Sequence, residues 1–330
     1  MRPLCRELSN QYDLNIKKYQ YIRSSYFLDT NKGKFTLRKV DLSKEQLGFC
    51  YEVDTHLSQC HFDILNNIYI TKKKTPYAVV GDECYVMQAY KPCEETDFRD
   101  YNDLREMVLA LAKFHKVAVG IESKIREPEK VKMKNIYEYY KKRQSENHKL
   151  KKHIGTLKQK SNFELMFLED CEQYRELEQM ALDGINSDLA CRLIQKVWET
   201  KSVAHKDFTY HTVNKTDSKE YIISKIDICN YDIQVLDLAQ IMSKIMQKND
   251  WDKKILYNLI QEYNKERILS KDEMSLFKFM MIYPEKYNSI CLKYMGSKRR
   301  WNYSMFEQKW MNMLSYKDKQ LDVAKMIQTW

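Results

Sequence analysis

Helix-breaking residues are rare in this chain, which has only 7 Gly and 5 Pro among its 330 residues. Glycine supplies backbone conformations that other residues adopt only with strain, and proline interrupts helices. The scarcity of both predicts long helices joined by simple connections. It also leaves little glycine for a loop that would bring its backbone over phosphate groups.

The cysteines and the hydropathy pattern indicate the compartment. Nine cysteines are scattered along the chain, and no two have the C-x-x-C spacing. The chain is long enough to build a core without covalent links, so reduced thiols are expected rather than a disulfide framework or a structural zinc site. The N-terminal stretch lacks the apolar core of a signal peptide, and no apolar run has the length of a membrane span. We therefore expect synthesis in the cytoplasm and no membrane partner.

The net charge of +10 is concentrated in one stretch. Residues 123–160 contain thirteen Lys or Arg and four Asp or Glu. Such a stretch could bind an anionic partner, but apolar residues recur in it at helical spacing, which favours a solvated pair of helices on a larger body. Binding of single-stranded nucleic acid would need aromatics spread among the basic residues. The aromatics are clustered at 137–140 instead, so nucleic acid is the least favoured partner.

The first ninety residues have mostly the pattern of β-strands. YIRSSYFLDT (21–30) and KFTLRKV (34–40) are rich in β-branched and aromatic residues and flank a turn signal ending at Gly33. They predict a hairpin with Gly33 at positive φ. The later runs IYITKK, PYAVV and CYVMQAY predict three more strands, the last two joined in a second hairpin at Gly81.

One helix is predicted among these strands. Ser43 begins SKEQ, the pattern of a capping box in which Ser43 and Gln46 each cap the other's backbone. A helix from about 44 to 58 should follow. Residues 1–90 therefore predict a small β-rich lobe with a single helix.

Helical periodicity dominates from residue 100 onward. In DLREMVLALAKFHKV the apolar residues share one face, and His115 continues it, so we expect a packed, hydrogen-bonded core histidine rather than a ligand. Helices are also predicted over 128–182, over 187–200 and in the C-terminal part of the chain. Short strands near 203–228 interrupt them.

Three aspartates accompany the short strands. Phosphoryl transfer needs a metal on the phosphates, a carboxylate that orients the attacking hydroxyl, and a cation. Asp207 and Asp227 each follow a short apolar strand and suit the roles of base and magnesium ligand. Asp237 begins the helix QVLDLAQIM, where a carboxylate can accept backbone amides and brace the preceding loop.

These aspartates belong to an ordered set of motifs. The set runs from about residue 20 to 310 and comprises NKGKFTLRKV, LALAKFHKVAVG, HKDFTYHTV, ICNYDIQVLDLAQIM and FMMIYPEKYNSICLKY. In this order the motifs resemble the aminoglycoside-phosphotransferase-like branch of the protein-kinase-like fold, and within it the CotS family of bacterial spore coat proteins. The resemblance implies an α+β, bilobal fold with a small β-rich N-lobe over 1–90 and a large, mainly helical C-lobe over 91–330.

The resemblance also implies roles for matching residues. Asp207 would be the catalytic-loop base, Asp227 would hold magnesium, and Thr212 stands at the place of a second metal ligand. The segment Gln88-Ala89-Tyr90 would be the hinge, where backbone groups meet an adenine. ATP and Mg²⁺ are the cofactors so implied.

The lysine expected on the strand FTLRKV has changed. Arg38 stands in its place, and Lys39 lies one residue out of register, so its side chain should point to the other face. A planar guanidinium does not replace an ammonium conservatively. Glu52 is the acid expected to pair with Arg38, with Asp54 as a rival.

Two further features depart from the family pattern. Thr212 offers a hydroxyl where an asparagine amide is expected, and residues 22–25 contain no glycine that could bring the backbone over phosphates. Cys229, next to the metal-binding position, is expected to be a small buried residue rather than a reactive thiol.

Two functions therefore stay open. The first is a spore coat protein of the CotS family with a structural or assembly role, other coat proteins as partners, and a degenerate or weak phosphotransferase site, that is, a pseudokinase. The alternative is an active ATP-dependent phosphotransferase acting on a small hydroxylated molecule or on a coat protein. The resemblance implies a location in the spore coat of a sporulating bacterium.

Overall fold

The computed structural model describes residues 2–22, 24–297 and 303–330, and the chain divides into two compact units. Unit 1 contains Met1–Lys132, Lys196–Asp237 and Glu262–Arg267, and unit 2 contains Met133–Gln195, Leu238–Gln261 and Ile268–Trp330. The division into lobes at residue 90 is a different partition of the chain and stays a prediction. No helix in the described ranges is both long and apolar enough to cross a membrane.

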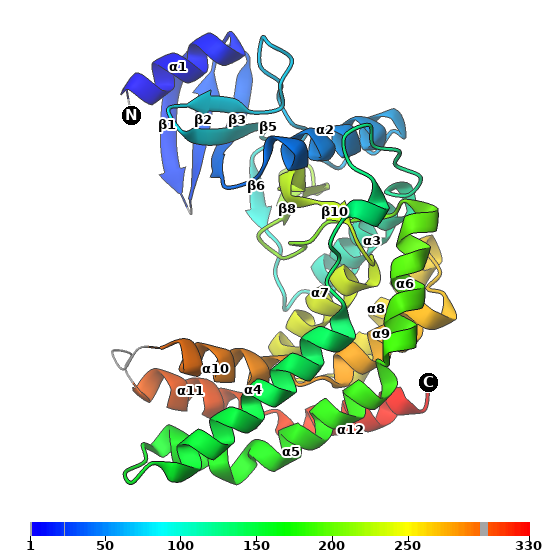
Figure 1. Ribbon diagram of the computed structural model, residues 1–330. Helices are drawn as coiled ribbons and strands as arrows, with labels where there is room; N and C mark the ends of the chain where they lie inside the picture. Colours follow the sequence, from blue (N-terminus) through cyan, green and yellow to red (C-terminus); the bar gives the residue numbers. More distant parts are fainter. Residues whose placement is uncertain (1, 23, 298–302) are drawn as a thin grey trace. The chain divides into compact units, whose positions relative to one another are not determined.

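A five-stranded antiparallel sheet forms the N-terminal part of unit 1 (Figure 1). Its order is β1-β2-β3-β5-β4. Both predicted hairpins are confirmed: β2 pairs with β3 and β4 with β5, and the turn glycines Gly33 and Gly81 have φ of 123° and 61°. The strand bounds are β1 Ile16–Ile22, β2 Ser25–Thr30, β3 Gly33–Val40, β4 Ala78–Val80 and β5 Glu83–Ala89.

Two strand predictions need correction. The run 21–30 is not one strand, because β1 ends at Ile22 and β2 begins at Ser25, and these two residues pair directly. Ser24 has a φ of 66°, which turns the chain between the two strands; Arg23 lies outside the described residues. The run IYITKK forms only an isolated bridge, Ile68 with Gln88, rather than a strand.

A second helix, which the sequence prediction missed, covers one face of this sheet. Helix α1 (Arg2–Tyr12) buries Leu8 and Tyr12 against Leu28, Phe35 and Leu37. The four-residue spacing of Leu8 and Tyr12 places both on one face of the helix. The hydrophobic effect of burying this face therefore favours the packing of α1 on the sheet.

Helix α1 also completes the edge strand β4. The side-chain amide of Gln11 donates to the carbonyl of Val79 at 2.8 Å and accepts from the N–H of Val79 at 3.3 Å. One side chain thus makes the two bonds that a neighbouring strand would make. Edge strands expose such groups unless something covers them.

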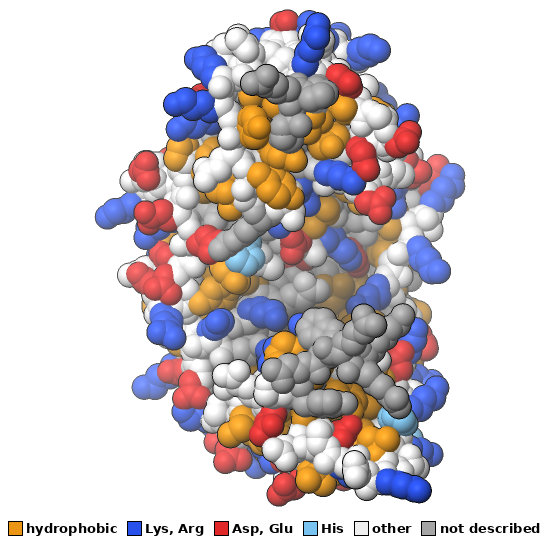
Figure 2. All heavy atoms as spheres, turned by 90° about the vertical axis from the view of Figure 1, so that its left-hand side faces the viewer, with side chains coloured by type: hydrophobic (Ala, Val, Ile, Leu, Met, Phe, Trp, Pro, Cys, Tyr) orange, Lys and Arg blue, Asp and Glu red, His pale blue; other side chains and the backbone are white. Residues whose placement is uncertain are grey.

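At the other edge, strand β1 is largely open to solvent. Tyr19, Tyr21 and Ile22 are among the exposed large hydrophobic side chains of the described residues. Figure 2 shows hydrophobic side chains gathered on the upper part of the face in view, where this strand lies.

Helix α2 (Lys44–Gln59) begins as predicted but is capped on one side only. Ser43 accepts from the backbone N–H of Gln46 at 3.1 Å. The Gln46 side chain does not return to Ser43; it donates to the carbonyl of Cys229 at 2.7 Å. The predicted reciprocal cap is therefore replaced by a bond to a distant segment.

The rest of unit 1 consists of one long helix and short strands. In α3 (Tyr101–Val117), His115 is fully buried, and its ring contacts the Tyr263 hydroxyl at 2.8 Å, as expected of a packed core histidine. One small sheet joins β6 (Cys93–Glu95), β8 (Val213–Thr216) and β9 (Tyr221–Ile223); another joins β7 (Val203–Ala204) and β10 (Asn230–Tyr231).

Unit 2 is helical. The predicted helix over 128–182 is broken into η1 (Pro128–Lys130), which belongs to unit 1, and α4 (Ile136–Thr156) and α5 (Asn162–Gly184). Asn135 caps α4, and Ser161 caps α5 through a capping box with Glu164. The remaining helices, some of which extend beyond this unit, are α6 Ser187–Thr200, α7 Val235–Lys248, α8 Lys253–Glu266, α9 Lys271–Ile282, α10 Glu285–Gly296, α11 Tyr303–Leu314 and α12 Lys317–Gln328.

The basic stretch 123–160 largely forms helix α4. Its apolar residues, including Ile136, Leu150 and Ile154, are buried, whereas its lysines are mostly exposed. Helix α4 packs against α5. The sequence predicts a solvated pair of helices on a larger body; the stretch instead forms one long solvated helix, α4, after the short η1.

Candidate functional site

The aspartates singled out in the sequence lie around the small sheets of unit 1. Asp207 stands in the loop after β7, Asp227 in the short helix η2 (Ile226–Ile228), and Asp237 in the first turn of α7. Strand β10 pairs with β7, Asn230 facing Ala204, and this pairing brings the segment after Asp227 beside the start of the Asp207 loop.

Asp237 braces that loop. Its carboxylate accepts from the backbone N–H of His205 at 2.6 Å and of Lys206 at 3.1 Å, and it lies 3.3 Å from the ring of His115. Burial raises the pKa of Asp237, but its hydrogen bond with His115 and its interactions with His205, including the backbone N–H, lower it more, so the pKa lies below its ordinary value. An ionised acceptor thus fixes the start of the Asp207 loop, whereas the sequence predicts a brace on the loop directly before α7.

Thr212 closes the loop rather than pointing an oxygen outward. It is fully buried, and its hydroxyl accepts from the N–H of Thr209 at 2.8 Å. The same hydroxyl can donate to the carbonyl of Asp207 at 2.8 Å or of Thr209 at 2.9 Å. A side chain engaged with three backbone groups has little capacity left for a metal ion.

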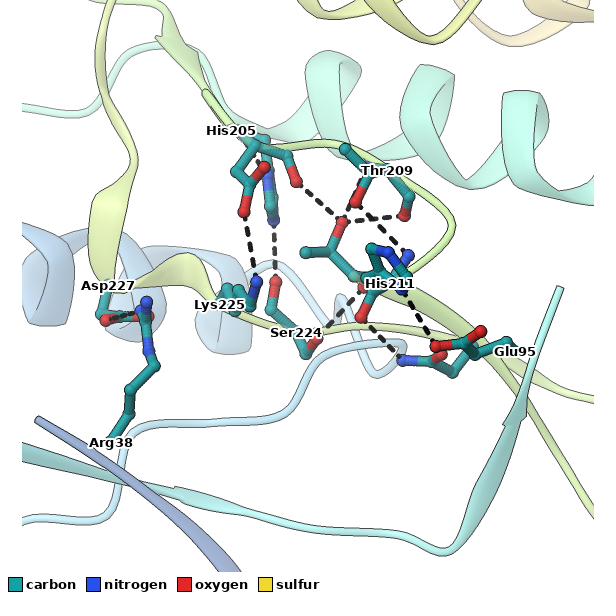
Figure 3. A network of polar contacts seen from close by, with 11 residues as sticks. Arg38, Glu95, His205, Thr209, His211, Ser224, Lys225 and Asp227 are labelled. Atoms are coloured by element: carbon teal, nitrogen blue, oxygen red, sulfur yellow. Dashed lines mark hydrogen bonds and ion pairs between the residues drawn. The ribbon is translucent and has the colours of Figure 1, made fainter. Parts of the chain in front are cut away.

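Asp207 itself carries an internal counter-ion. The Nζ of Lys225 lies 3.3 Å from its carboxylate, whose side chain is 39% exposed (Figure 3). The backbone N–H of Asp207 donates to the Nδ1 of His205 at 3.3 Å. Burial lowers the pKa of His205, so the imidazole is neutral and Nδ1 can accept.

Arg38 binds Asp227 directly. Its Nη2 donates to Oδ2 of Asp227, across 189 positions of the sequence (Figure 3). The Arg38 side chain is 25% exposed and that of Asp227 only 1%. The other oxygen, Oδ1, is buried and has no hydrogen-bond partner among the described residues. The Arg38 guanidinium thus already binds the carboxylate to which the sequence resemblance gives the role of magnesium ligand.

Glu52 does not pair with Arg38 within the described structure, contrary to expectation. It accepts from the hydroxyl of Ser123 and from the backbone N–H of Lys124, at 3.1 Å for the latter. Its position on α2 aims the carboxylate at the segment after α3. That geometry overturns the predicted pair.

The rival acid Asp54 is also engaged. It accepts from the Nδ2 of Asn67 at 3.0 Å and the backbone N–H of Ile68 at 3.1 Å. Burial raises its pKa to about 6. Lys39, as strand alternation predicts, lies away from Arg38 and pairs with Glu83 at 2.8 Å.

The sequence interpretation overlooked two lysines and an acid. Lys206 pairs with Asp232, which is 2% exposed, and Lys225 pairs with Asp207. Both lysines have positive φ, 74° and 61°, a conformation that is costly for a residue with a Cβ. Their positions beside His205 and Asp227 in the sequence were the available signal, but their pairing depends on backbone turns that no pattern predicts.

The predicted hinge uses its backbone inside the protein. The N–H of Ala89 donates to the carbonyl of Asn67 at 2.9 Å, and the N–H of Tyr90 to that of Lys34 at 3.0 Å. Gln88 donates its side chain to the carbonyl of Asn66 at 3.2 Å. An adenine could therefore use the Ala89 and Tyr90 amides only if these bonds were exchanged.

Cys229, fully buried, is the small core residue that the sequence predicts. Burial raises the pKa of its thiol well above the ordinary value, and its carbonyl accepts from Gln46. A buried protonated thiol is a poor nucleophile. The residue therefore serves packing.

The residues present do not complete a magnesium site. Asp227 offers one unpartnered oxygen but already holds a guanidinium, and the Thr212 hydroxyl is committed to the loop. Magnesium prefers several oxygen ligands in octahedral geometry. No group of three or more His, Cys, Asp or Glu that could hold a metal is found in the described parts of the chain.

Comparison with known proteins places this geometry in a family. A family model described as "Spore coat putative kinase YutH" matches residues 5–326. The chain belongs to this family. The YutH family has a spore coat context and a kinase-like assignment in common with the sequence resemblance, while CotS, the family named there, is not the one that matches.

Solved structures establish the fold of this YutH-family chain. It is similar to an aminoglycoside phosphotransferase from Alicyclobacillus acidocaldarius subsp. acidocaldarius DSM 446, with a TM-score of 0.87, 13% identity and coverage of 98% of this chain and 95% of that one. It is also similar to the AMP-bound spectinomycin phosphotransferase APH(9)-Ia (TM-score 0.66, 11% identity, coverage 99% and 97%). A third similar structure is amicoumacin kinase hAmiN with AMP-PNP, Ca²⁺ and Ami (0.59, 12%, 97% and 93%).

The predicted fold class is therefore confirmed: an aminoglycoside-phosphotransferase-like bilobal fold with an N-terminal antiparallel sheet and a large helical lobe. At these identities the similarity establishes the fold and leaves the chemistry to the residues of this chain.

Proposed function

We propose that this chain is a spore coat protein whose kinase-like fold serves a structural or assembly role, with a degenerate phosphotransferase site. The observation that most strongly supports this proposal is the Arg38–Asp227 ion pair. A carboxylate that must neutralise metal and phosphate charge is here neutralised by the protein itself. The CotS resemblance, which concerns coat proteins of this fold, points to the same role.

Two further ion pairs support this proposal. Lys225 lies against Asp207, and Lys206 against Asp232. Asp207, Asp227 and Asp232 thus each have a cation of their own, so a metal–nucleotide complex would have to displace lysine or arginine before it could bind. The short β1–β2 connection adds to this cost, because direct pairing of Ile22 with Ser25 leaves no long loop to cover phosphates.

Thermal unfolding with and without ATP and Mg²⁺ tests the proposal. A ligand present at about 100 times its Kd would stabilise the folded chain by about 2.7 kcal/mol, a readable shift in Tm. We expect no Mg²⁺-dependent shift at millimolar nucleotide for the wild type or for Asp227→Ala. A shift in the wild type that disappears in Asp227→Ala would refute a purely structural role.

A double variant tests whether the residues at positions 38 and 212 alone account for the absence of nucleotide binding. Arg38→Lys with Thr212→Asn supplies the residue types that the family pattern expects at both positions. If this double variant gains a Mg²⁺-dependent shift, those two residues account for the loss of nucleotide binding. If it does not, the internal lysines and the occupied hinge amides also exclude the nucleotide.

An active phosphotransferase is the second candidate, and one observation favours it. Asp227 keeps a buried Oδ1 without a partner in the described residues, an atom that a cation would satisfy. Asp207 is partly exposed, as a base that meets an acceptor hydroxyl must be. The acceptor would be a small hydroxylated molecule or a coat protein, and ATP consumption that depends on Asp207 would establish this candidate.

A further inference from the structure

Most of the chain's net positive charge lies in unit 2. One group of lysines there comes from three helices: Lys244 and Lys248 on α7, Lys286 and Lys293 on α10, and Lys309 on α11. We call these five residues the lysine cluster. Helices α10 and α11 pack against each other (Figure 1).

Lys286 and Lys293 lie seven positions apart on α10 (Glu285–Gly296), and this spacing puts both on one side of the helix. Lys286 is half-buried, and burial lowers the pKa of its ammonium; the charges of the other four members lower it further. None of the five forms an ion pair with an acid among residues 2–22, 24–297 and 303–330. Five like charges with no direct ion pair, and with Glu285 as a nearby acid, are unfavourable for the free protein, and an anionic ligand relieves that repulsion.

A cavity of about 270 Å³ adjoins the cluster at Lys293. Its lining comes from α4, α10 and the residues before α10. Two polar atoms of lining residues, Nε of Arg143 and the hydroxyl of Tyr283, are buried and lack a hydrogen-bond partner in the described chain. Buried polar groups are normally satisfied, so an incoming acceptor would gain two bonds at no cost to existing ones.

The cavity also contains an acid and two occupied aromatic rings. Glu285 lines it and lies near Lys244 and Arg143, which offset its charge. Lys134 stands 3.0 Å from the centre of the Tyr139 ring, and Arg143 lies 5.0 Å from the same ring. Tyr283 stacks on Tyr140 at 3.6 Å.

These features select among anionic partners. Five charges spread over three helices suit a ligand with several negative charges, and the cavity of about 270 Å³ is large enough to admit a carboxylate side chain. Nucleic-acid bases need open aromatic faces on which to stack, and the rings of this cavity already carry cations or another ring. A polycationic acceptor would be repelled by the same lysines.

We propose that the lysine cluster and its cavity form a docking site for an acidic segment of a partner protein. The Asp and Glu side chains of that segment pair with the lysines, and one carboxylate enters the cavity to accept from Arg143 and Tyr283. This inference names the partner chemistry for the assembly role proposed above and rests on that role. The two proposals can be tested independently. Nucleotide binding by unit 1 would overturn the proposed function without changing the result of a peptide-binding experiment.

Fluorescence anisotropy with a labelled peptide of about ten glutamates tests the site on the full chain, at low salt and again near 0.15 M, where the Debye length is about 8 Å. We expect saturable binding that weakens with salt. Lys286→Gln with Lys293→Gln should weaken it about tenfold, since both removed charges lose direct ion pairs. The control Lys254→Gln with Lys325→Gln removes the same charge from exposed positions outside the cluster and should change binding less than about twofold.

A third variant tests the cavity. Tyr283→Phe removes only a hydroxyl that has no partner in the described structure, so it should leave the Tm unchanged while weakening the peptide several-fold. Equal binding by this variant would remove the cavity from the site. Equal losses in the cluster and control variants, or no binding at low salt, would overturn the proposal. So would tighter binding of a DNA duplex of matched charge through the same lysines, because the partner would then be a nucleic acid.

Discussion

Replacing Arg38 and replacing Asp227 should destabilise the protein by different amounts. Both groups are charged, but only Asp227 is shut off from water, at 1% exposure against 25% for the Arg38 side chain. Arg38→Gln leaves a buried carboxylate without a counter-ion and should lower the free energy of unfolding by about 3–5 kcal/mol. Asp227→Asn leaves a guanidinium that can turn toward water, and should cost about 1–2 kcal/mol.

A double-mutant cycle of the two variants measures the free energy of the Arg38–Asp227 interaction. The double variant should be less destabilised than the sum of the single ones by about 1–3 kcal/mol, because the unpaired carboxylate is no longer present. Urea unfolding gives the three free energies. Hydrogen exchange at β3 and at residues 226–229 shows whether the loss is local to the pair, which matters because the chain has two units and need not unfold in one step.

One result would refute the reasoning. If Arg38→Gln costs no more than Asp227→Asn, then Asp227 reaches water in solution and the pair does not seal the site. Lys39→Gln is the matched control, since Lys39 lies on the same strand but pairs at the surface with Glu83. Its loss should leave the free energy of unfolding nearly unchanged, because exposed ion pairs contribute little.

Two further predictions concern the stability of unit 2. Burial raises the pKa of Glu178 to about 7, although Asn147 and Asn288 donate to it. Because this folded-state pKa is above the ordinary 4.5, the contribution of Glu178 is full below about pH 4.5 and is lost as pH rises through 7. Urea unfolding at pH 5 and pH 8 should show the wild type losing about 3 kcal/mol relative to Glu178→Gln; equal pH dependence would contradict the assignment. Gly184→Ala should destabilise by about 1–3 kcal/mol, since its Cβ would lie 2.1 Å from the Phe279 ring, whereas Gly155→Ala, with no atom within 4 Å, should stabilise by about 0.5–1 kcal/mol. Similar Tm changes in these two glycine variants would be inconsistent with the packing of α5 against α9.

Sequence patterns correctly predicted the features of the fold that depend on short-range interactions. The turns at Gly33 and Gly81 follow from their positive φ, and the opposite directions of Arg38 and Lys39 follow from strand alternation. The brace at Asp237 follows from the affinity of a carboxylate for the amides of a neighbouring loop. The turns and the strand directions depend on nearby residues alone, whereas the amides that Asp237 binds lie 31 and 32 positions away in the sequence.

Contacts between distant segments were beyond the sequence. Nothing near Arg38 indicates that its partner is 189 positions away rather than on α2. Gln46 has the spacing of a reciprocal cap, yet the carbonyl of Cys229 competes for its amide and binds it. The pairing of Lys225 with Asp207 requires a left-handed backbone at a lysine, which only the surrounding structure can enforce.

The side chain of Gln11 limits how copies of this sheet could associate. By bonding both backbone groups of Val79, it ends the sheet at β4, so a foreign strand has no free pair of groups there to extend. A sheet with one open edge can pair with a strand from one other molecule, and no further strand can then be added. Strand addition through β1 would therefore yield closed pairs, whereas an unbounded fibre requires two growing edges. In a family with a spore coat context, a helix that closes one edge of the sheet leaves further association to the other edge and to side-chain contacts.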